Sequence, residues 1–268
     1  MNVQTDPKKL VTGQYKDTKP LNIRQAYNDQ FKPRIDLDEE IRKVLQNDKT
    51  GDILDIGCGN GNTLIYLRKN GFSGKMIGID ISDGIMQPGK KVASECHLEF
   101  QNASADNLPF GENTFDIVIA RHMLYHMPDV AKVMQEVKRV LKPGGKFIIT
   151  LNSMDNKPIF NHIIQKIKEK FGFVIVRNAN VINTENIQRF LAPHFSFSVY
   201  EFRTSYPIES TSPFIEYFKT YQTTFERELT ESEWRDVLTE AERELSSLMA
   251  KDSNLHEYNV GSVITANL

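Results

Sequence analysis

Two carboxylates flank a glycine-rich turn, and their chemistry predicts what the turn binds. Asp55 directly precedes the glycines in the stretch GDILDIGCGNG (residues 51–61), and Asp80 ends the next apolar segment. A diphosphate at the turn would be repelled by the Asp55 carboxylate, whereas a cationic amino group would be attracted and a ribose diol could donate hydrogen bonds to Asp80. The pair therefore favours a nucleoside that carries an amine and no phosphate.

The turn itself is predicted to connect a buried strand to a helix. Residues 53–56 form a short apolar run that ends at the glycines, and residues 62–69 have helical spacing. Gly57, Gly59 and Gly61 lack a Cβ, so the backbone can take positive φ and a ligand can approach it closely. A strand, a glycine turn and a helix N-terminus together are typical of a nucleotide site. The alternative is a tight turn that binds no ligand.

Composition limits the class of partner and the compartment. The chain has 268 residues and a formal net charge of -2, which argues against nucleic acid or an anionic membrane as the main partner. Cys58 and Cys96 belong to no cluster with metal-ligand spacing, and a disulfide framework is not expected. The N-terminus has no signal-peptide core, and no run of about 18 apolar residues occurs. We therefore expect a cytoplasmic protein without a metal centre.

Strands and helices are predicted to alternate through the first half of the chain. Short apolar strands are expected at 53–56, 75–80, 98–101, 114–120 and 146–151, with helical segments between them. This alternation implies βαβ units and a parallel sheet with right-handed crossovers. Ligands bind such sheets beyond the carboxyl ends of the strands, which is where the glycine turn lies.

Both ends of the chain are predicted to cover this edge of the sheet. Residues 1–47 form an N-terminal arm, with two amphipathic helices broken near Pro33. Further on, strands at 196–204 and 257–268 flank a helical insertion at about 208–253 that is rich in aromatic residues. We expect the arm and the insertion to act as lids.

Several motifs together resemble those of class I S-adenosylmethionine-dependent methyltransferases of the small-molecule type. They are DIGCGNG, GID, ADNLPF, FDIVIARHMLYHMPD and LKPGGKF, and they match in order and spacing over about residues 50–151. The resemblance implies an α/β fold for residues 48–268. It would contain a Rossmann-like seven-stranded sheet in the order 3-2-1-4-5-7-6, with strand 7 antiparallel, helices on both faces and a helical lid. It also implies S-adenosyl-L-methionine as the cofactor.

The resemblance assigns roles in cofactor binding. The turn residues Asp55, Gly57, Cys58 and Gly59 would hold the methionine part. Asp80 would grip the ribose hydroxyls.

The remaining cofactor contacts are expected near the adenine and the arm. Ile81 would lie beside the adenine. Where many relatives have an adenine-binding Asp, this chain has Ser104, and we expect its hydroxyl and the backbone of Ala105 to share that role. Arg121 aligns with a position whose backbone carbonyl faces the cofactor, and Tyr15 would close over it.

The catalytic candidates follow predicted strands 4 and 5. Methyl transfer from a sulfonium is an in-line displacement, so positioning does most of the work and no metal is required. His126 is the candidate general base, and the alternative is that it packs under its loop and bonds a backbone carbonyl. Asn152 and Asp155 share the same rim. Asp155 could bind a cationic or amine acceptor, or cap the helix that follows.

The sequence thus predicts methyl transfer to a nitrogen or oxygen of a small molecule or small peptide natural product. N-methylation of an amino-terminal arginine, as in plantazolicin methyltransferases, is a narrower alternative that no motif establishes. A nicotinamide-dependent oxidoreductase and a non-catalytic cofactor-binding protein are rivals from other classes, and Asp55 argues against the first. Neither nucleic acid nor membrane is an expected partner, and the oligomeric state is not visible in the sequence.

Overall fold

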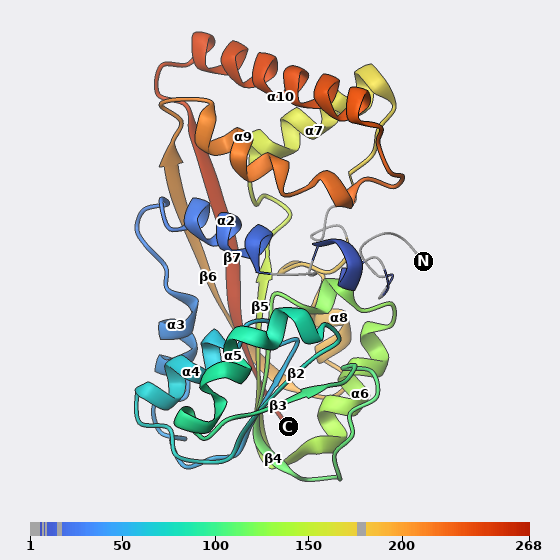
Figure 1. Ribbon diagram of the computed structural model, residues 1–268. Helices are drawn as coiled ribbons and strands as arrows, with labels where there is room; N and C mark the ends of the chain where they lie inside the picture. The colour runs from blue at the N-terminus through green and yellow to red at the C-terminus, as the bar shows by residue number, and fades with distance from the viewer. Residues whose placement is uncertain (1–5, 7, 9, 15–17, 176–180) are drawn as a thin grey trace.

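The protein contains one seven-stranded sheet in the order β3-β2-β1-β4-β5-β7-β6. A computed structural model, shown in Figure 1, describes residues 6, 8, 10–14, 18–175 and 181–268. The pairs among β1 to β5 are parallel, and β7 runs antiparallel to both β5 and β6. The predicted fold class and strand order are confirmed.

The strands begin and end close to their predicted bounds. They are β1 (Ile53–Ile56), β2 (Met76–Asp80), β3 (Glu99–Asn102), β4 (Phe115–Arg121), β5 (Leu141–Asn152), β6 (Ser196–Pro207) and β7 (His256–Asn267). The largest difference is in β5, which starts before the predicted position because Leu141 pairs with Phe115 ahead of a register shift at which β5 has more residues than β4. Both neighbours of β1 are parallel strands, and every residue of β1 is buried, as its apolar run predicts.

The described helices and helical turns surround the sheet or extend beyond it. They are the π-helical turn η1 (Leu10–Gln14), α2 (Lys19–Asn28), α3 (Leu37–Val44), α4 (Asn62–Lys69), α5 (Asp83–Cys96), η2 (Leu124–His126), α6 (Val130–Val140), α7 (Pro158–Phe171), α8 (Gln188–Leu191), α9 (Ser212–Lys219), η4 (Gln222–Thr224) and α10 (Glu231–Lys251). Within the described residues, none of the helices is both long enough and apolar enough to cross a membrane.

Alternating side chains of the central strands build a core on each face of the sheet. In β4, Val118 packs in the core that includes α6, whereas Ile117 and Ile119 pack in the core that includes α3 and α4. Buried β strands with helices on both faces hold their carboxyl ends rigidly. The glycine turn after β1 is therefore fixed by the core beneath it.

A third core lies beyond the carboxyl ends of the strands. It joins α2, α7, α9 and α10 through buried side chains that include Tyr27, Phe31, Ile163, Phe214 and Val237. Figure 1 shows α7, α9 and α10 stacked above the sheet, with β6 and β7 extending toward them and α2 between the two layers. α9 and α10 lie within the range predicted for the insertion. The boundaries of an arm at 1–47 and a domain at 48–268 stay a prediction.

Gly61 should be the glycine of the turn that tolerates a side chain least. Its φ is +78°, and a Cβ there would lie 2.6 Å from Cζ of Phe100. Gly144 has nearly the same φ, +77°, with no atom within 4 Å of a Cβ, and so serves as the control. We expect Gly144→Ala to lower the free energy of unfolding by about 1 kcal/mol and Gly61→Ala by about 2–4 kcal/mol, because only the second adds a clash to the backbone strain. Urea unfolding measures both, and equal losses would contradict the packing around Phe100.

Candidate active site

A cavity of about 540 Å³ lies at the carboxyl ends of the strands. Its volume is in the range of about 300–1,000 Å³ that small-molecule sites have. The strand order divides the lining of the cavity into two sides. β1 and β2 lie on one side of β4, whereas β5, β7 and β6 lie on the other. α2 lines it as well: Leu21 packs near Cys58 on the β1 side, whereas Tyr27 packs in the core with α7 and α9. The arm thus spans the cavity from one side to the other.

The glycine turn has the backbone that its sequence predicts. Gly57 and Gly59 have φ of +70° and +55°. A Cβ at Gly57 would lie 2.7 Å from Cβ of Met123, whereas Gly59 has no atom within 4 Å of that position. The Gly59 N–H donates to Asp80 Oδ2 over 3.0 Å, and Ser82 N–H donates to Asp80 Oδ1 over 2.9 Å. The turn and the second carboxylate therefore form one rigid unit.

On the β1 side of the cavity, Asp55 is a buried carboxyl group with an oxygen that is unpaired among the described residues. It is 1% exposed, and its Oδ1 has no hydrogen-bond partner within the described part of the chain. Burial raises the pKa of Asp55 to about 8, and the positive charge of Arg121 opposes the rise. A buried carboxylate oxygen without a partner is unfavourable unless a ligand supplies one. The amino group of a methionine moiety is a ligand group that fits.

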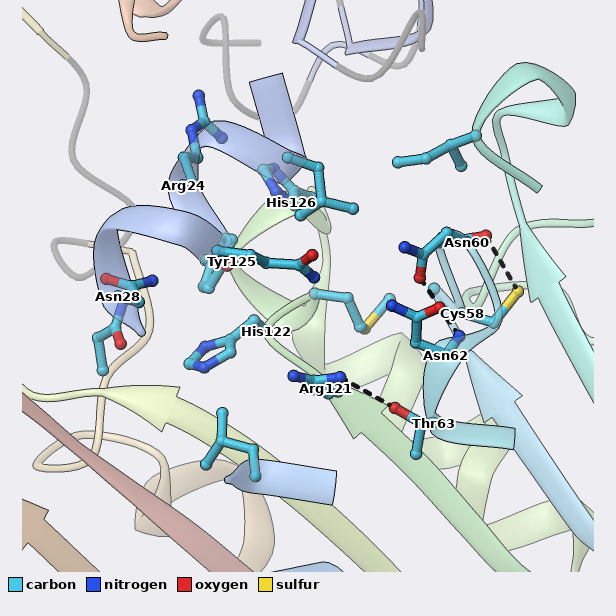
Figure 2. A pocket seen from close by; sticks show the side chains of 18 of the residues that line it. Arg24, Asn28, Cys58, Asn60, Asn62, Thr63, Arg121, His122, Tyr125 and His126 are labelled. Atoms are coloured by element: carbon cyan, nitrogen blue, oxygen red, sulfur yellow. Dashed lines mark hydrogen bonds between the residues drawn. The ribbon is translucent and has the colours of Figure 1, made fainter. Parts of the chain in front are cut away.

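The side chain of Arg121 connects three elements around Asp55. Its Nη1 donates to Asp38 Oδ1 over 2.9 Å and to Thr63 Oγ1 over 3.2 Å, and Thr63 Oγ1 donates to the same Asp38 oxygen over 2.8 Å. Figure 2 shows Arg121 and Thr63 meeting beside the cavity. Only the backbone of Arg121 was expected to matter. The role of Asp38 was missed, although an acid in the first turn of α3 is a signal for it.

On the far side of β2, Ser104 is already engaged with a neighbour. Its Oγ donates to Asp106 Oδ1 over 2.6 Å, and both residues line the cavity together with Ile81 and Ala105. The hydroxyl proton is therefore not available to a ligand, and the oxygens of Ser104 and Asp106 remain as acceptors. Ser104 is thus paired with Asp106, an acid two positions on that was not selected from the sequence.

The residues after β4 bring two histidines to the cavity. His126 is half-buried in η2, and its ring lies edge-on to the buried Tyr125, with 4.6 Å between ring centroids. His122 has φ of +50°, and its N–H donates to Thr150 Oγ1 over 3.1 Å. Burial lowers the pKa of His122 to about 3, so its imidazole is neutral at neutral pH. The sequence pointed to His126, not His122, as the candidate general base.

Asn152 and Asp155, the two candidates near the end of β5, differ in their position relative to the cavity. Asn152 lines the cavity. Asp155 does not: it is exposed in the turn that follows, where its N–H donates to Ser153 Oγ over 3.1 Å. It does not cap α7 either, because Lys157 occupies that position and the Glu257 carboxylate accepts from the first N–H groups of the helix. The prediction that Asp155 shares a rim of the cavity with Asn152 is therefore wrong.

All the cofactor residues selected from the sequence that the structure describes line this one cavity. They are Asp55, Gly57, Cys58, Gly59, Asp80, Ile81, Ser104, Ala105 and Arg121. Tyr15 lies outside the described residues. Across the cavity, in Figure 2, Arg24 and Asn28 of α2 stand opposite Cys58 and Asn60, with His122 and Tyr125 between them. Asn28 was not selected from the sequence.

Comparison with known proteins identifies part of the chain. Residues 54–149 match the family model described as a methyltransferase domain. The chain is 36% identical over 132 residues to the demethylmenaquinone methyltransferase of Staphylococcus saprophyticus, covering 48% of this chain and 55% of that protein. It is 31% identical over 150 residues to that of Listeria monocytogenes, covering 53% and 63%. The likeness thus reaches less than two thirds of either relative's length.

Solved structures share the fold. The YcgJ protein of Bacillus subtilis superposes with a TM-score of 0.60 at 17% identity, covering 86% of this chain and 97% of that one. Phosphoethanolamine N-methyltransferase 2 of Haemonchus contortus, solved with S-adenosyl-L-methionine, gives 0.60 at 19% identity, covering 97% and 59%. With the matching motifs and the confirmed strand order, these findings show that residues 54–149 belong to a class I S-adenosylmethionine-dependent methyltransferase domain.

Proposed function

We propose that the protein transfers the methyl group of S-adenosyl-L-methionine to a nitrogen or oxygen atom of a small molecule held in the same cavity. The observation that carries the proposal is the unpartnered, buried oxygen of Asp55 beside a glycine turn that is bonded to Asp80. These groups fit an amine and a ribose diol. They do not fit a diphosphate, so the nicotinamide alternative is disfavoured.

Each part of the cofactor has candidate partners on the β1 side. Asp55 would pair with the amino group. Asp80, held by the N–H groups of Gly59 and Ser82, keeps lone pairs for the ribose hydroxyls. Ser104 and Asp106 offer acceptor oxygens to the adenine amine. The bound cofactor supplies an electrophilic methyl group on a sulfonium.

The chain's own contribution to the reaction is to position the acceptor. Displacement needs the acceptor atom about 3 Å from the methyl group and in line with the leaving sulfur. His122 and His126 follow β4, Asn152 ends β5, and all three line the cavity. His126 is the candidate general base for an acceptor that must lose a proton, because the lowered pKa of His122 keeps its imidazole neutral but makes it a weak base.

Asp55→Asn should weaken binding of S-adenosylhomocysteine by about 10- to 100-fold, because it removes a charge-assisted hydrogen bond to the amino group. Asp129→Asn is the matched control, since Asp129 caps α6 and does not line the cavity. Calorimetric titration with S-adenosylhomocysteine and with NADH measures both variants. Binding of NADH in place of S-adenosylhomocysteine by the unaltered protein would overturn the proposal.

Affinity for S-adenosylhomocysteine should rise with pH. Burial raises the pKa of Asp55 in the ligand-free fold from 3.8 to about 8, so the folded state keeps a proton that the unfolded chain releases, and stability falls as pH rises through that window. A cationic ligand favours the ionised carboxylate, so binding releases the proton.

We therefore expect affinity to increase between about pH 6 and about pH 8, by at most about tenfold per unit. Asp55→Asn should remove most of this dependence. Ligand-free Asp55→Asn should also gain thermal stability relative to the unaltered protein as pH rises. A pH dependence that persists in the variant would assign the proton to another group.

A further inference from the structure

Lys157 occupies a position that folding alone does not favour. Its side chain is 4% exposed, its φ is +56°, and it directly precedes the first turn of α7. Lysine is rarely buried, a side chain is strained at positive φ, and a helix N-terminus repels a cation. The backbone is held there all the same, since Lys157 N–H donates to the Tyr258 carbonyl over 2.9 Å. A residue kept at such a combined cost is a candidate for binding a ligand.

The ammonium group of Lys157 reaches the cavity with most of its donors unused. Nζ donates to Asn28 Oδ1 over 2.9 Å and lies 4.1 Å from the ring centroid of Phe31. Among the described residues, no carboxylate oxygen lies within 4.0 Å of it. Burial lowers the pKa of Lys157, and the Glu257 carboxylate opposes that shift without contacting the ammonium. Within the described residues, the ammonium thus contacts one neutral oxygen, that of Asn28, and three aromatic rings, but no anion.

Two amide groups complete a set of donors. Asn28 uses its Oδ1 to accept from Lys157, and Asn156 uses its Oδ1 to accept from the Val260 N–H over 3.0 Å. These bonds fix which end of each amide is the NH₂ group, and neither Nδ2 donates to a described residue. Asn28, Asn156 and Lys157 all line the cavity. Donors without an acceptor and with a positive charge among them match an oxyanion.

The charged residues that line the cavity also bear on which ligand can bind near Lys157. Asp55 lies in β1, Asp80 ends β2 and Asp106 follows β3, and the nearby Asp38 is paired with Arg121. Arg24 lies on α2, in the same helix as Asn28, with its guanidinium bonded to Thr220 on the α9 side. Asp29, the acid next to Asn28, forms a salt bridge with Arg34 at 3.2 Å. At Lys157, a cationic acceptor would thus meet a buried ammonium group.

We propose that the methyl acceptor carries an oxyanion, either a carboxylate or a phosphate, that binds between Lys157, Asn28 and Asn156. This inference rests on the proposed function, because it names the substrate class of the same cavity. It makes Lys157 a specificity-determining residue. It also disfavours an amino-terminal arginine as the acceptor, since a guanidinium would face the ammonium.

The test is calorimetric titration of protein saturated with S-adenosylhomocysteine with inorganic phosphate, acetate and methylammonium. We expect phosphate or acetate to bind and methylammonium not to bind; the better of the two anions identifies the source of the oxyanion. Lys157→Met should weaken anion binding by about tenfold or more while affinity for S-adenosylhomocysteine stays unchanged. Lys132→Met, which removes an exposed lysine of α6, is the matched control and should change neither.

Asn28→Asp keeps the lysine and gives it an internal carboxylate at the 2.9 Å contact. It should abolish anion binding and raise the melting temperature, so the proposal stays testable where Lys157→Met fails to fold. Absence of anion binding by the unaltered protein, equal affinity in Asn28→Asp, or preferential binding of methylammonium would overturn the oxyanion site. Repeating the anion titrations without S-adenosylhomocysteine separates this outcome from a failure of cofactor binding, which would overturn the proposed function instead.

Discussion

The site depends on a carboxylate that the fold buries without fully satisfying. Asp55 lies in β1, between the parallel neighbours β2 and β4, and one of its oxygens has no partner among the described residues. The charge of Arg121 opposes the rise in the pKa of Asp55 that burial causes, but its Nη1 already donates to Asp38 and Thr63. The ligand-free cavity therefore keeps an unsatisfied acceptor in a low-dielectric position, where a cation is bound more strongly than in water. The unsatisfied Asp55 oxygen lowers the stability of the ligand-free fold, and a bound cationic ligand would restore that stability.

The strand order extends this arrangement across the cavity. In the sheet, β1 and β2 lie on one side of β4, and β5 lies on the other. The acids of β1 and β2 are therefore separated from Lys157, which follows β5. α2 bridges the two sides, with Leu21 near the glycine turn and Asn28 on Lys157. In the proposed reaction, a cationic methyl donor and an anionic acceptor would be held by groups of opposite sign at opposite ends of one cavity. Their mutual attraction would then favour the approach that the displacement requires.

The two sides also differ in how far the sequence could predict them. The turn after β1 is coded locally: consecutive residues supply the strand, the positive-φ glycines and the helix start, so Asp55 and Asp80 could be selected from spacing and resemblance. The acceptor side is built by tertiary packing. Asn28 and Lys157 lie 129 positions apart, and no local pattern connects them. Asp155 was chosen because an acid after a strand is a common ligand residue, yet the turn exposes it and directs the lysine two positions later into the cavity.

Glu257 explains how a lysine can remain uncommitted in such a place. It is fully buried on β7, and its carboxylate accepts from the N–H groups of Ile159 and Phe160, which a helix N-terminus would otherwise leave unpaired. Its charge offsets the positive end of α7 and attracts the Lys157 ammonium from a distance, without bonding to it. A direct salt bridge would stabilise both groups and close the site. By using its oxygens on the backbone, Glu257 makes the buried cation tolerable and leaves its donors directed at Asn28, the aromatic rings and the cavity.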